Sequence, residues 1–165
     1  MKRIDRVLKK IKGDLEQRKI LEVACGCGEL SIAAASFATI VHCIDLEDKR
    51  LLPEAKENER IAFQCMDARR MEFSQETFDT ILVYNAIGHL TGIVSGVLDE
   101  CLRVLKANGI IHVISSFKMD QITIDEELLP YLELHNIPFT MESDPVYRYV
   151  KIQKQHQGMN REAEP

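Results

Sequence analysis

Apolar residues along this chain fall into short runs that alternate with segments in which apolar positions recur at helical spacing. The short runs predict five buried strands, at residues 20–24, 39–44, 61–66, 78–84 and 110–115. Short apolar strands that alternate with helices indicate βαβ units, which form a parallel sheet covered by helices on both faces. The pattern therefore predicts an α/β fold with a doubly wound, mostly parallel sheet.

The helical spacing predicts five helices, at residues 1–18, 29–38, 47–57, 94–105 and 122–135. The first of these is amphipathic, because apolar residues recur on one side of it at Ile4, Val7, Leu8, Ile11 and Leu15. Pro53 removes an amide from the third helix. Asn108 and Gly109 supply the left-handed stop that we expect after the fourth helix.

The end of the chain departs from this alternation. Two extended runs, residues 137–142 and 146–153, are joined only by Ser-Asp-Pro. A turn this short can only connect antiparallel strands, since a parallel pair needs a long crossover. We therefore expect a seven-stranded sheet that ends in an antiparallel hairpin, within one domain at residues 1–155, followed by a disordered tail at residues 156–165.

Composition narrows the class of protein. The chain has 165 residues and a formal net charge of −5, which gives no general attraction to DNA or RNA. No apolar run reaches the length of a membrane span and no signal peptide is evident, so a cytoplasmic protein without membrane contact is expected. Five cysteines within apolar segments indicate reduced, buried thiols.

The distribution of charge is uneven, because the first 19 residues hold eight Lys or Arg against three Asp or Glu. This excess is the one electrostatic hint of an RNA partner. A solvated helix face is the interpretation that we favour, and the helix could equally close over a bound ligand as a lid.

The stretch Glu-Val-Ala-Cys-Gly-Cys-Gly, residues 22–28, lies where the first strand passes into the first crossover helix. Gly26 and Gly28 lack a Cβ, so a ligand can approach the main chain there. A metal site is not expected, because Cys25 and Cys27 lack the spacing of zinc ligands and a second Cys or His pair. We interpret the turn as a ligand site built by the backbone.

The residues around this turn indicate a nucleoside ligand without phosphates. A dinucleotide site would need a third glycine where Ser31 stands, and Glu29 at the helix start would repel a pyrophosphate. Asp45, after the second strand, is placed to accept hydrogen bonds from both hydroxyls of a ribose. Asp67, after the third strand, could hold the exocyclic amine of an adenine.

These motifs together resemble the class I, Rossmann-like S-adenosylmethionine-dependent methyltransferases. The likeness rests on Glu22 to Gly28, Asp45, Met66-Asp67-Ala68, Phe78 to Ile81, the turn from Leu102 to Gly109, and the closing hairpin. The resemblance implies S-adenosylmethionine as the cofactor and no metal. It also implies that the cofactor contacts Glu22, Ala24, Cys25, Gly26, Gly28, Asp45, Leu46, Asp67, Ala68 and Asn85.

In such a protein the methyl acceptor approaches the end of the fourth strand. We expect Tyr84 and Asn85 to position the acceptor and His89 to remove its proton, with a backbone-bonded His89 as an equal alternative. A small-molecule acceptor is favoured over RNA or a protein side chain. DNA is disfavoured, because the Asn- or Asp-Pro-Pro-Tyr stretch of nucleic-acid amino methyltransferases is absent.

Two other functions stay open from the sequence. One is a module that binds S-adenosylmethionine without turnover, and a more distant one is an NAD-dependent oxidoreductase. The chain departs from the family that it resembles, because only one helix precedes the first strand and the usual N-terminal lid and insertions after the fifth strand are nearly missing. We therefore expect an acceptor pocket that is open or is completed by a second subunit in a homodimer.

Overall fold

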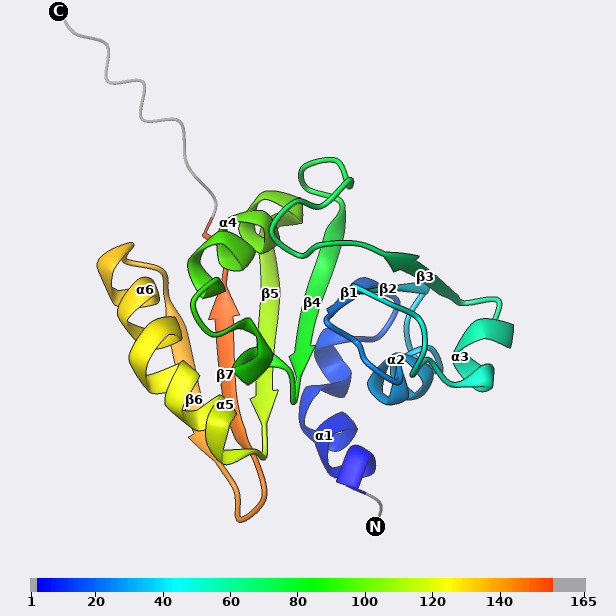
Figure 1. Ribbon diagram of the computed structural model, residues 1–165, viewed down its shortest axis with the longest axis horizontal. Helices are drawn as coiled ribbons and strands as arrows, with labels where there is room; N and C mark the ends of the chain where they lie inside the picture. Colours follow the sequence, from blue (N-terminus) through cyan, green and yellow to red (C-terminus); the bar gives the residue numbers. More distant parts are fainter. Residues whose placement is uncertain (1–2, 156–165) are drawn as a thin grey trace, which may run out of the picture.

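The computed structural model describes residues 3–155, so the tail predicted at residues 156–165 lies outside the described residues. Seven strands form one sheet in the order β3-β2-β1-β4-β5-β7-β6 (Figure 1). The strands are β1 (Lys19–Val23), β2 (Ile40–Asp45), β3 (Ile61–Cys65), β4 (Phe78–Tyr84), β5 (Leu105–Ser115), β6 (Phe139–Ser143) and β7 (Arg148–Gln153). The pairs among β1 to β5 are parallel, whereas β7 is antiparallel to both β5 and β6. The predicted fold class is confirmed.

Helices cover both faces of this sheet. They are α1 (Arg3–Ile11), α2 (Glu29–Ala34), α3 (Pro53–Glu57), α4 (Val94–Val104), α5 (Lys118–Thr123) and α6 (Leu129–Leu134), with 3-10 turns η1 (Lys12–Asp14) and η2 (Ile87–Leu90) and a π turn η3 (Ile124–Leu128). The α1 and α2 helices pack against Leu82 and Ile114 on one face. On the other face α4, η3 and α6 pack against Ile81, Ile111 and Val113. Strand residues therefore alternate between two cores.

The strand order reverses between β1 and β4. From β1 the chain moves through β2 to β3 on one side, and from β4 it moves to β5 on the other. In doubly wound sheets a crevice opens outside the carboxyl ends of the two strands at such a reversal. The glycine-rich turn after β1 and the segment after β4 both lie at this place.

The helix predicted at residues 47–57 is shorter than expected, because α3 begins only at Pro53. Proline suits the first turn of a helix but forces the preceding residue to be extended, and Leu52 has φ −65° and ψ 147°. Residues 46–52 therefore form a loop. The Leu52 amide donates to the carbonyl of Cys27 at 3.1 Å, which fastens this loop to the glycine-rich turn.

The helix predicted at residues 94–105 ends one residue earlier, at Val104, and the predicted stop at Asn108 is part of a strand. The α4 helix ends at Val104, and Leu105 already pairs with Phe78 as the first residue of β5. The register then shifts, since Thr80 pairs with Ile110. Asn108 has φ +60°, so the predicted left-handed residue is present but forms a bulge in β5 instead of a helix stop.

The helix predicted at residues 122–135 is a longer helical segment with an irregular centre. It starts at Lys118 and passes through the π turn Ile124–Leu128 before α6. Pro130 follows this turn and cannot donate an amide hydrogen bond to the residue four positions earlier. A wider turn before a proline relieves the clash of its ring with the preceding carbonyl, which explains the irregularity.

The other elements lie within a few residues of their predicted ranges. The α1 helix ends at Ile11, before Gly13, instead of extending to residue 18, and α2 ends at Ala34 instead of residue 38. The hairpin turn is set by Asp144, whose Oδ1 accepts from the amides of Val146 at 2.7 Å and Tyr147 at 2.8 Å. No helix among residues 3–155 is long and apolar enough to cross a membrane.

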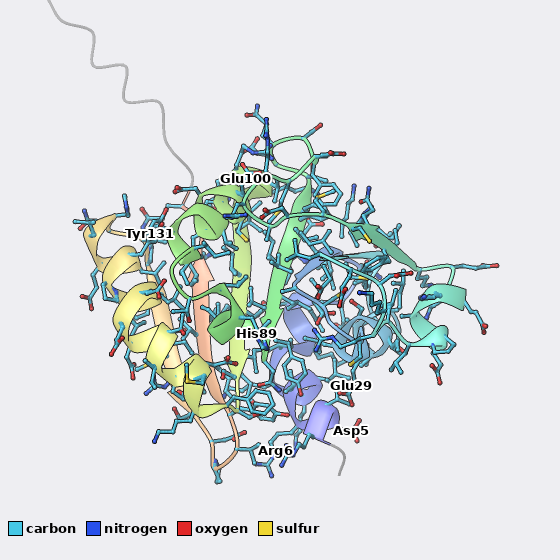
Figure 2. All side chains as sticks on the ribbon, in the orientation of Figure 1. Asp5, Arg6, Glu29, His89, Glu100 and Tyr131 are labelled. Carbon is cyan, nitrogen blue, oxygen red and sulfur yellow. The ribbon has the colours of Figure 1, made fainter. Side chains whose placement is uncertain are left out.

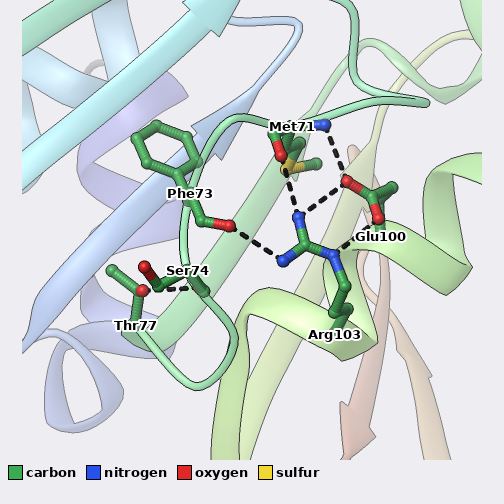
Figure 3. A network of polar contacts seen from close by, with 6 residues as sticks. All are labelled: Met71, Phe73, Ser74, Thr77, Glu100 and Arg103. Carbon is green, nitrogen blue, oxygen red and sulfur yellow. Dashed lines mark hydrogen bonds and ion pairs between the residues drawn. The ribbon is translucent and has the colours of Figure 1, made fainter.

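The connection from β3 to β4 runs without a helix in residues 66–77. Side chains of α4 hold this loop instead (Figure 3). Arg103 donates to the carbonyls of Met71 and Phe73, each at 2.8 Å, and pairs with Glu100. Glu100 in turn accepts from the amide of Met71 at 2.7 Å. These contacts satisfy backbone groups that a helix would have paired internally.

Candidate functional site

The turn after β1 takes a left-handed backbone conformation that residues other than glycine rarely adopt. Ala24, Gly26 and Gly28 have φ values of +54°, +55° and +76°. A Cβ on Gly28 would lie 2.9 Å from Cδ1 of Leu51, so Gly28 is needed for close packing as well as for its conformation. The turn is therefore pressed against the loop that follows β2.

Asp45 connects this turn to the end of β2. Its Oδ2 accepts from the amide of Gly26 at 2.7 Å, and its Oδ1 accepts from the amide of Leu46 at 2.8 Å. An ionised carboxylate can accept about four hydrogen bonds, so Asp45 keeps the capacity to accept more. A half-buried carboxylate therefore stands beside the partly exposed backbone at Gly26.

Two hollows open beside the turn. They share Ala24, Arg50 and His89, so we treat them as two halves of one cleft. The first hollow is lined by Asp45, Leu46, Met66, Asp67, Ala68, Arg69, Leu90 and Ile93, among others. The second is lined by Arg3, Glu22, Cys25, Gly26, Cys27, Glu29, Tyr84, Asn85, Ala86 and Phe117. All the residues predicted for the site line the cleft except Gly28, which lies beneath it.

In the first hollow, Asp67 is already engaged. Arg69 donates to both of its carboxylate oxygens, with Nη2 2.7 Å from Oδ2, and the amide of Arg69 donates to Oδ1 at 2.8 Å. The hydrogen bonds from the Arg69 side chain lower the pKa of Asp67 to about 2. Asp67 therefore stays ionised, and a ligand would compete with Arg69 for it.

Glu22 lies below the turn and is almost fully buried, with 1% of its surface exposed. Its carboxylate accepts a hydrogen bond from the hydroxyl of Ser31, the residue that stands where a dinucleotide site would have its third glycine. Burial raises the pKa of Glu22 to about 7, against the opposing effect of that hydrogen bond. Glu22 is thus a buried support for the turn, whereas Glu29 is exposed at the start of α2.

Tyr84 and Asn85 meet in the second hollow at the end of β4. The hydroxyl of Tyr84 lies 2.9 Å from that of Tyr147, and burial raises the pKa of Tyr84 above its usual range. The side-chain oxygen of Asn85 accepts from the amide of Ser116 at 2.8 Å. That bond fixes the side-chain orientation of Asn85 and leaves its NH₂ group for a ligand.

His89 lies on η2, with its side chain exposed over the cleft. Figure 2 shows His89 and Glu29 toward the end of the molecule where β4 and β5 finish, with Glu100 at the opposite end. The amide of His89 donates to the carbonyl of Ala86 at 2.9 Å, and the buried carboxylate of Asp120 accepts from the neighbouring amide of Gly88 at 2.8 Å. The backbone of η2 is therefore anchored, and the imidazole is available.

The residues of the cleft that were not predicted from the sequence include Arg3, Arg50 and Phe117. Arg50 belongs to the loop at residues 46–52, which was predicted to be helical, and its Nη2 would lie 3.5 Å from a Cβ on Gly26. Phe117 directly follows the turn after β5, a position that the rule for carboxyl ends of strands could have suggested. Arg3 carries no local signal, because only the packing of α1 brings it to the cleft.

The cysteines depart in part from the prediction of buried thiols. Cys25, Cys43 and Cys101 are buried, but Cys27 and Cys65 are exposed. Cys27 is exposed because it lies between the two left-handed glycines, and Cys65 because it ends the edge strand β3. Residues 3–155 contain no group of three or more His, Cys, Asp or Glu side chains arranged to hold a metal ion.

The features of the cleft fit an adenosine ligand that bears no phosphate. The turn exposes backbone, Asp45 stands at the second strand, and the exposed carboxylate of Glu29 occupies the helix start where a phosphate would bind. A positively charged ligand meets no such repulsion there. The cleft of this structure thus agrees with the ligand class inferred from the sequence.

Comparison with known proteins tests this inference. Residues 20–109, more than half of the chain, match the family model described as a methyltransferase domain. No curated protein sequence matches the chain significantly.

Solved structures share the fold at low sequence identity. An S-adenosylmethionine-dependent methyltransferase from Aquifex aeolicus is 17% identical with a TM-score of 0.75, covering 92% of this chain and 89% of its own. The N-methyltransferase NodS from Bradyrhizobium japonicum is 15% identical with a TM-score of 0.72, covering 93% and 95%. The cyclase SpnF is 17% identical with a TM-score of 0.73, covering 92% and 79%. The chain therefore belongs to the methyltransferase-domain family with the class I fold, and its cofactor is S-adenosylmethionine.

Proposed function

We propose that this methyltransferase transfers the methyl group of S-adenosylmethionine to a small-molecule acceptor bound in the second hollow. The observation that carries the proposal is the continuity of the cleft. Its first half offers Asp45 and Asp67 to an adenosine, and its second half offers Asn85, His89 and Phe117 to another molecule. The glycine-rich turn lies between the halves, where a ligand that spans both would cross it.

The residues of the chain have separate proposed roles. Asp45 binds the ribose hydroxyls, the backbone at Gly26 accommodates the centre of the cofactor, and Glu22 supports the turn from below. When bound, S-adenosylmethionine would supply a methyl carbon on a positively charged sulfur; the lone pair of the acceptor would form a bond to that carbon in line as the carbon–sulfur bond breaks, with its electrons left on sulfur. Asn85 orients the acceptor through its NH₂ group, Tyr84 lines the wall, and His89 accepts the proton of a hydroxyl or amine.

The α1 helix supports a small molecule over RNA as the acceptor. Two of its basic side chains are paired with the hairpin, Arg6 with Asp144 and Lys10 with Glu142, and the Lys12 side chain that follows the helix pairs with Glu16. The acids of the hairpin therefore offset part of the charge excess that suggested RNA. The buried stripe of α1 also fixes the helix to the sheet beside the cleft.

Calorimetric titration with S-adenosylhomocysteine tests the cofactor site. We expect Asp45→Ala to weaken binding at least about 30-fold, because it removes charged hydrogen bonds each worth roughly 1.5–3 kcal/mol. Asp48→Ala is the matched control, since Asp48 lies in the same loop and pairs with Lys56 at the surface, so its affinity should stay within about twofold. Binding of NAD in place of S-adenosylhomocysteine would contradict the proposal.

Turnover over a panel of small acceptors tests catalysis. We expect His89→Ala to lower the rate about 100-fold or more without changing the affinity for S-adenosylhomocysteine, as loss of a general base does. If the wild-type protein binds S-adenosylmethionine tightly and methylates no acceptor, a module that binds without turnover is the better account.

A further inference from the structure

The second hollow is lined by two acidic and two basic side chains, and within residues 3–155 three of these four make no hydrogen bond or ion pair. Glu22 is bonded to Ser31 below the turn, and Glu29 is exposed at the start of α2. Arg3, in α1, and Arg50, in the loop between β2 and α3, both line the hollow. Within residues 3–155 neither guanidinium makes a hydrogen bond or an ion pair, whereas those of Arg6, Arg60 and Arg69 each face an acid or a carbonyl.

The cofactor accounts for two of these charges. The amino-acid end of S-adenosylmethionine carries one ammonium and one carboxylate. Glu29 can pair with the ammonium, and Arg50, which lies over Gly26, can pair with the carboxylate. Arg3 then remains without a partner in the protein or in the cofactor.

An apolar group is exposed beside this arginine. Phe117 lines the same hollow and has 54% of its surface exposed, although it is a large apolar side chain. Met119, also exposed, is two residues further on α5. An exposed aromatic ring at the rim of a concave site is typical of a surface that binds a ligand.

We infer that the methyl acceptor is a small organic acid, with an apolar body that packs on Phe117 and a carboxylate or phosphate group that pairs with Arg3. This inference rests on the proposed function and names the substrate class of the same site. A cationic acceptor is disfavoured, because the unpaired guanidinium of Arg3 faces the hollow and the cofactor adds a positive sulfur.

Binding of matched probes to the full-length protein saturated with S-adenosylhomocysteine tests this assignment. The probes are aromatic and aliphatic carboxylates and phosphate monoesters, each compared with its neutral amide or alcohol by NMR titration. At least one acid should bind about tenfold or more tightly than its neutral counterpart, the amount expected of one charge-assisted pair in a partly exposed site. The series with the larger preference identifies the acidic group.

Two variants separate the parts of the site. Arg3→Gln should abolish the preference for the acid while the affinity for S-adenosylhomocysteine stays within about twofold, because Arg3 pairs with the acceptor alone. Phe117→Ala should weaken the acid and its neutral counterpart alike, by about fivefold or more, since the ring packs on the apolar body of either. Lys9→Gln on α1 and Leu134→Ala on α6 are the controls, because they make the same kinds of change at exposed positions that do not line the cleft.

The outcomes are distinct. Equal binding of acids and neutral counterparts, or a preference that persists in Arg3→Gln, overturns the assignment while the cofactor site stands. Binding that Phe117→Ala leaves unchanged also overturns it. A wild-type protein that does not bind S-adenosylhomocysteine contradicts the proposed function itself.

Discussion

Two polar regions of this molecule differ in how their charged side chains are paired: those around Asp14 have partners, and several of those in the cleft have none. Beside the sheet, on the face covered by α1, the carboxylate of Asp14 lies 2.9 Å from Nε2 of His112 and accepts from Lys151 at 2.8 Å. The carbonyl of Asp14 accepts from the hydroxyl of Thr80 at 2.6 Å. In the cleft, by contrast, Arg3 and Arg50 have no partner among residues 3–155, and Glu29 makes no ion pair there.

The difference separates groups that hold the fold from groups that are available to a ligand. The Asp14 cluster joins η1 to β4, β5 and β7, and hydrogen bonding to His112 contributes most to lowering the pKa of Asp14, to about 2. The cleft instead lies between loops that follow the strands. Its unpaired charged side chains are exposed and stay hydrated, so the fold is not destabilised by their lack of a partner. We therefore expect substitutions in the first region to change stability and those in the second to change binding.

The largest effect on stability is expected for Asp14→Ala. The free energy of unfolding should fall by about 3 kcal/mol, because the substitution leaves the buried His112 and the nearby Lys151 without their partner. Urea unfolding measures this change, and calorimetry should find the affinity for S-adenosylhomocysteine within about twofold of wild type. A parallel loss of affinity would show that the two regions are not independent.

Glu22 combines features of both regions, because it is buried like the Asp14 cluster and supports the turn that lines the cleft. Its pKa of about 7 in the folded protein lies above its ordinary value of 4.5, so folding favours the protonated form. The stability that this proton contributes is present below pH 4.5 and is lost as the pH rises through 7. Relative to Glu22→Gln, the wild type should lose about 2 kcal/mol of unfolding free energy between pH 5 and pH 8.

Urea unfolding of both proteins at the two pH values checks this prediction. The groups with lowered pKa values, such as Asp14 and Asp67, lose their contribution only in more acidic solution and cancel in the comparison. A difference between the two proteins that does not depend on pH would contradict a raised pKa at Glu22.

The smallest effect on stability is expected for Glu29→Gln in the cleft. The free energy of unfolding should change by no more than about 0.5 kcal/mol, since the side chain is exposed and unpaired. The affinity for S-adenosylhomocysteine should fall about fivefold through the lost pairing with its ammonium. The control is Glu59→Gln, which changes an exposed acid outside the cleft and should alter neither quantity. An affinity that Glu29→Gln leaves unchanged would contradict the proposed pairing of Glu29 with the ammonium of the cofactor.

The sequence predicted the sheet and the frame of the site because both depend on local patterns. Alternating apolar runs identify β1 to β5, the short Ser-Asp-Pro connection identifies the hairpin, and strand ends place Asp45 and the glycine-rich turn. These features need no knowledge of packing between distant segments.

The remaining features depend on contacts between segments far apart in the chain. Arg3 reaches the cleft only because the apolar stripe of α1 packs on the sheet, and Arg50 only because Leu52 is bonded to Cys27. The bulge at Asn108 depends on pairing with β4, and Asp67 is engaged by Arg69, which the pattern of strands does not indicate.

The loop between β3 and β4 connects the first hollow of the cleft to α4 at the opposite end of the molecule. Residues 66–69 line that hollow, and Met71 immediately beyond them is held by Arg103 and Glu100 of α4. A change on the outer turn of α4 can therefore alter how firmly this wall is held, without touching any ligand. We therefore expect substitutions of Arg103 or Glu100 to change how tightly the first hollow holds its ligand, while the side chains that line the second hollow stay in place.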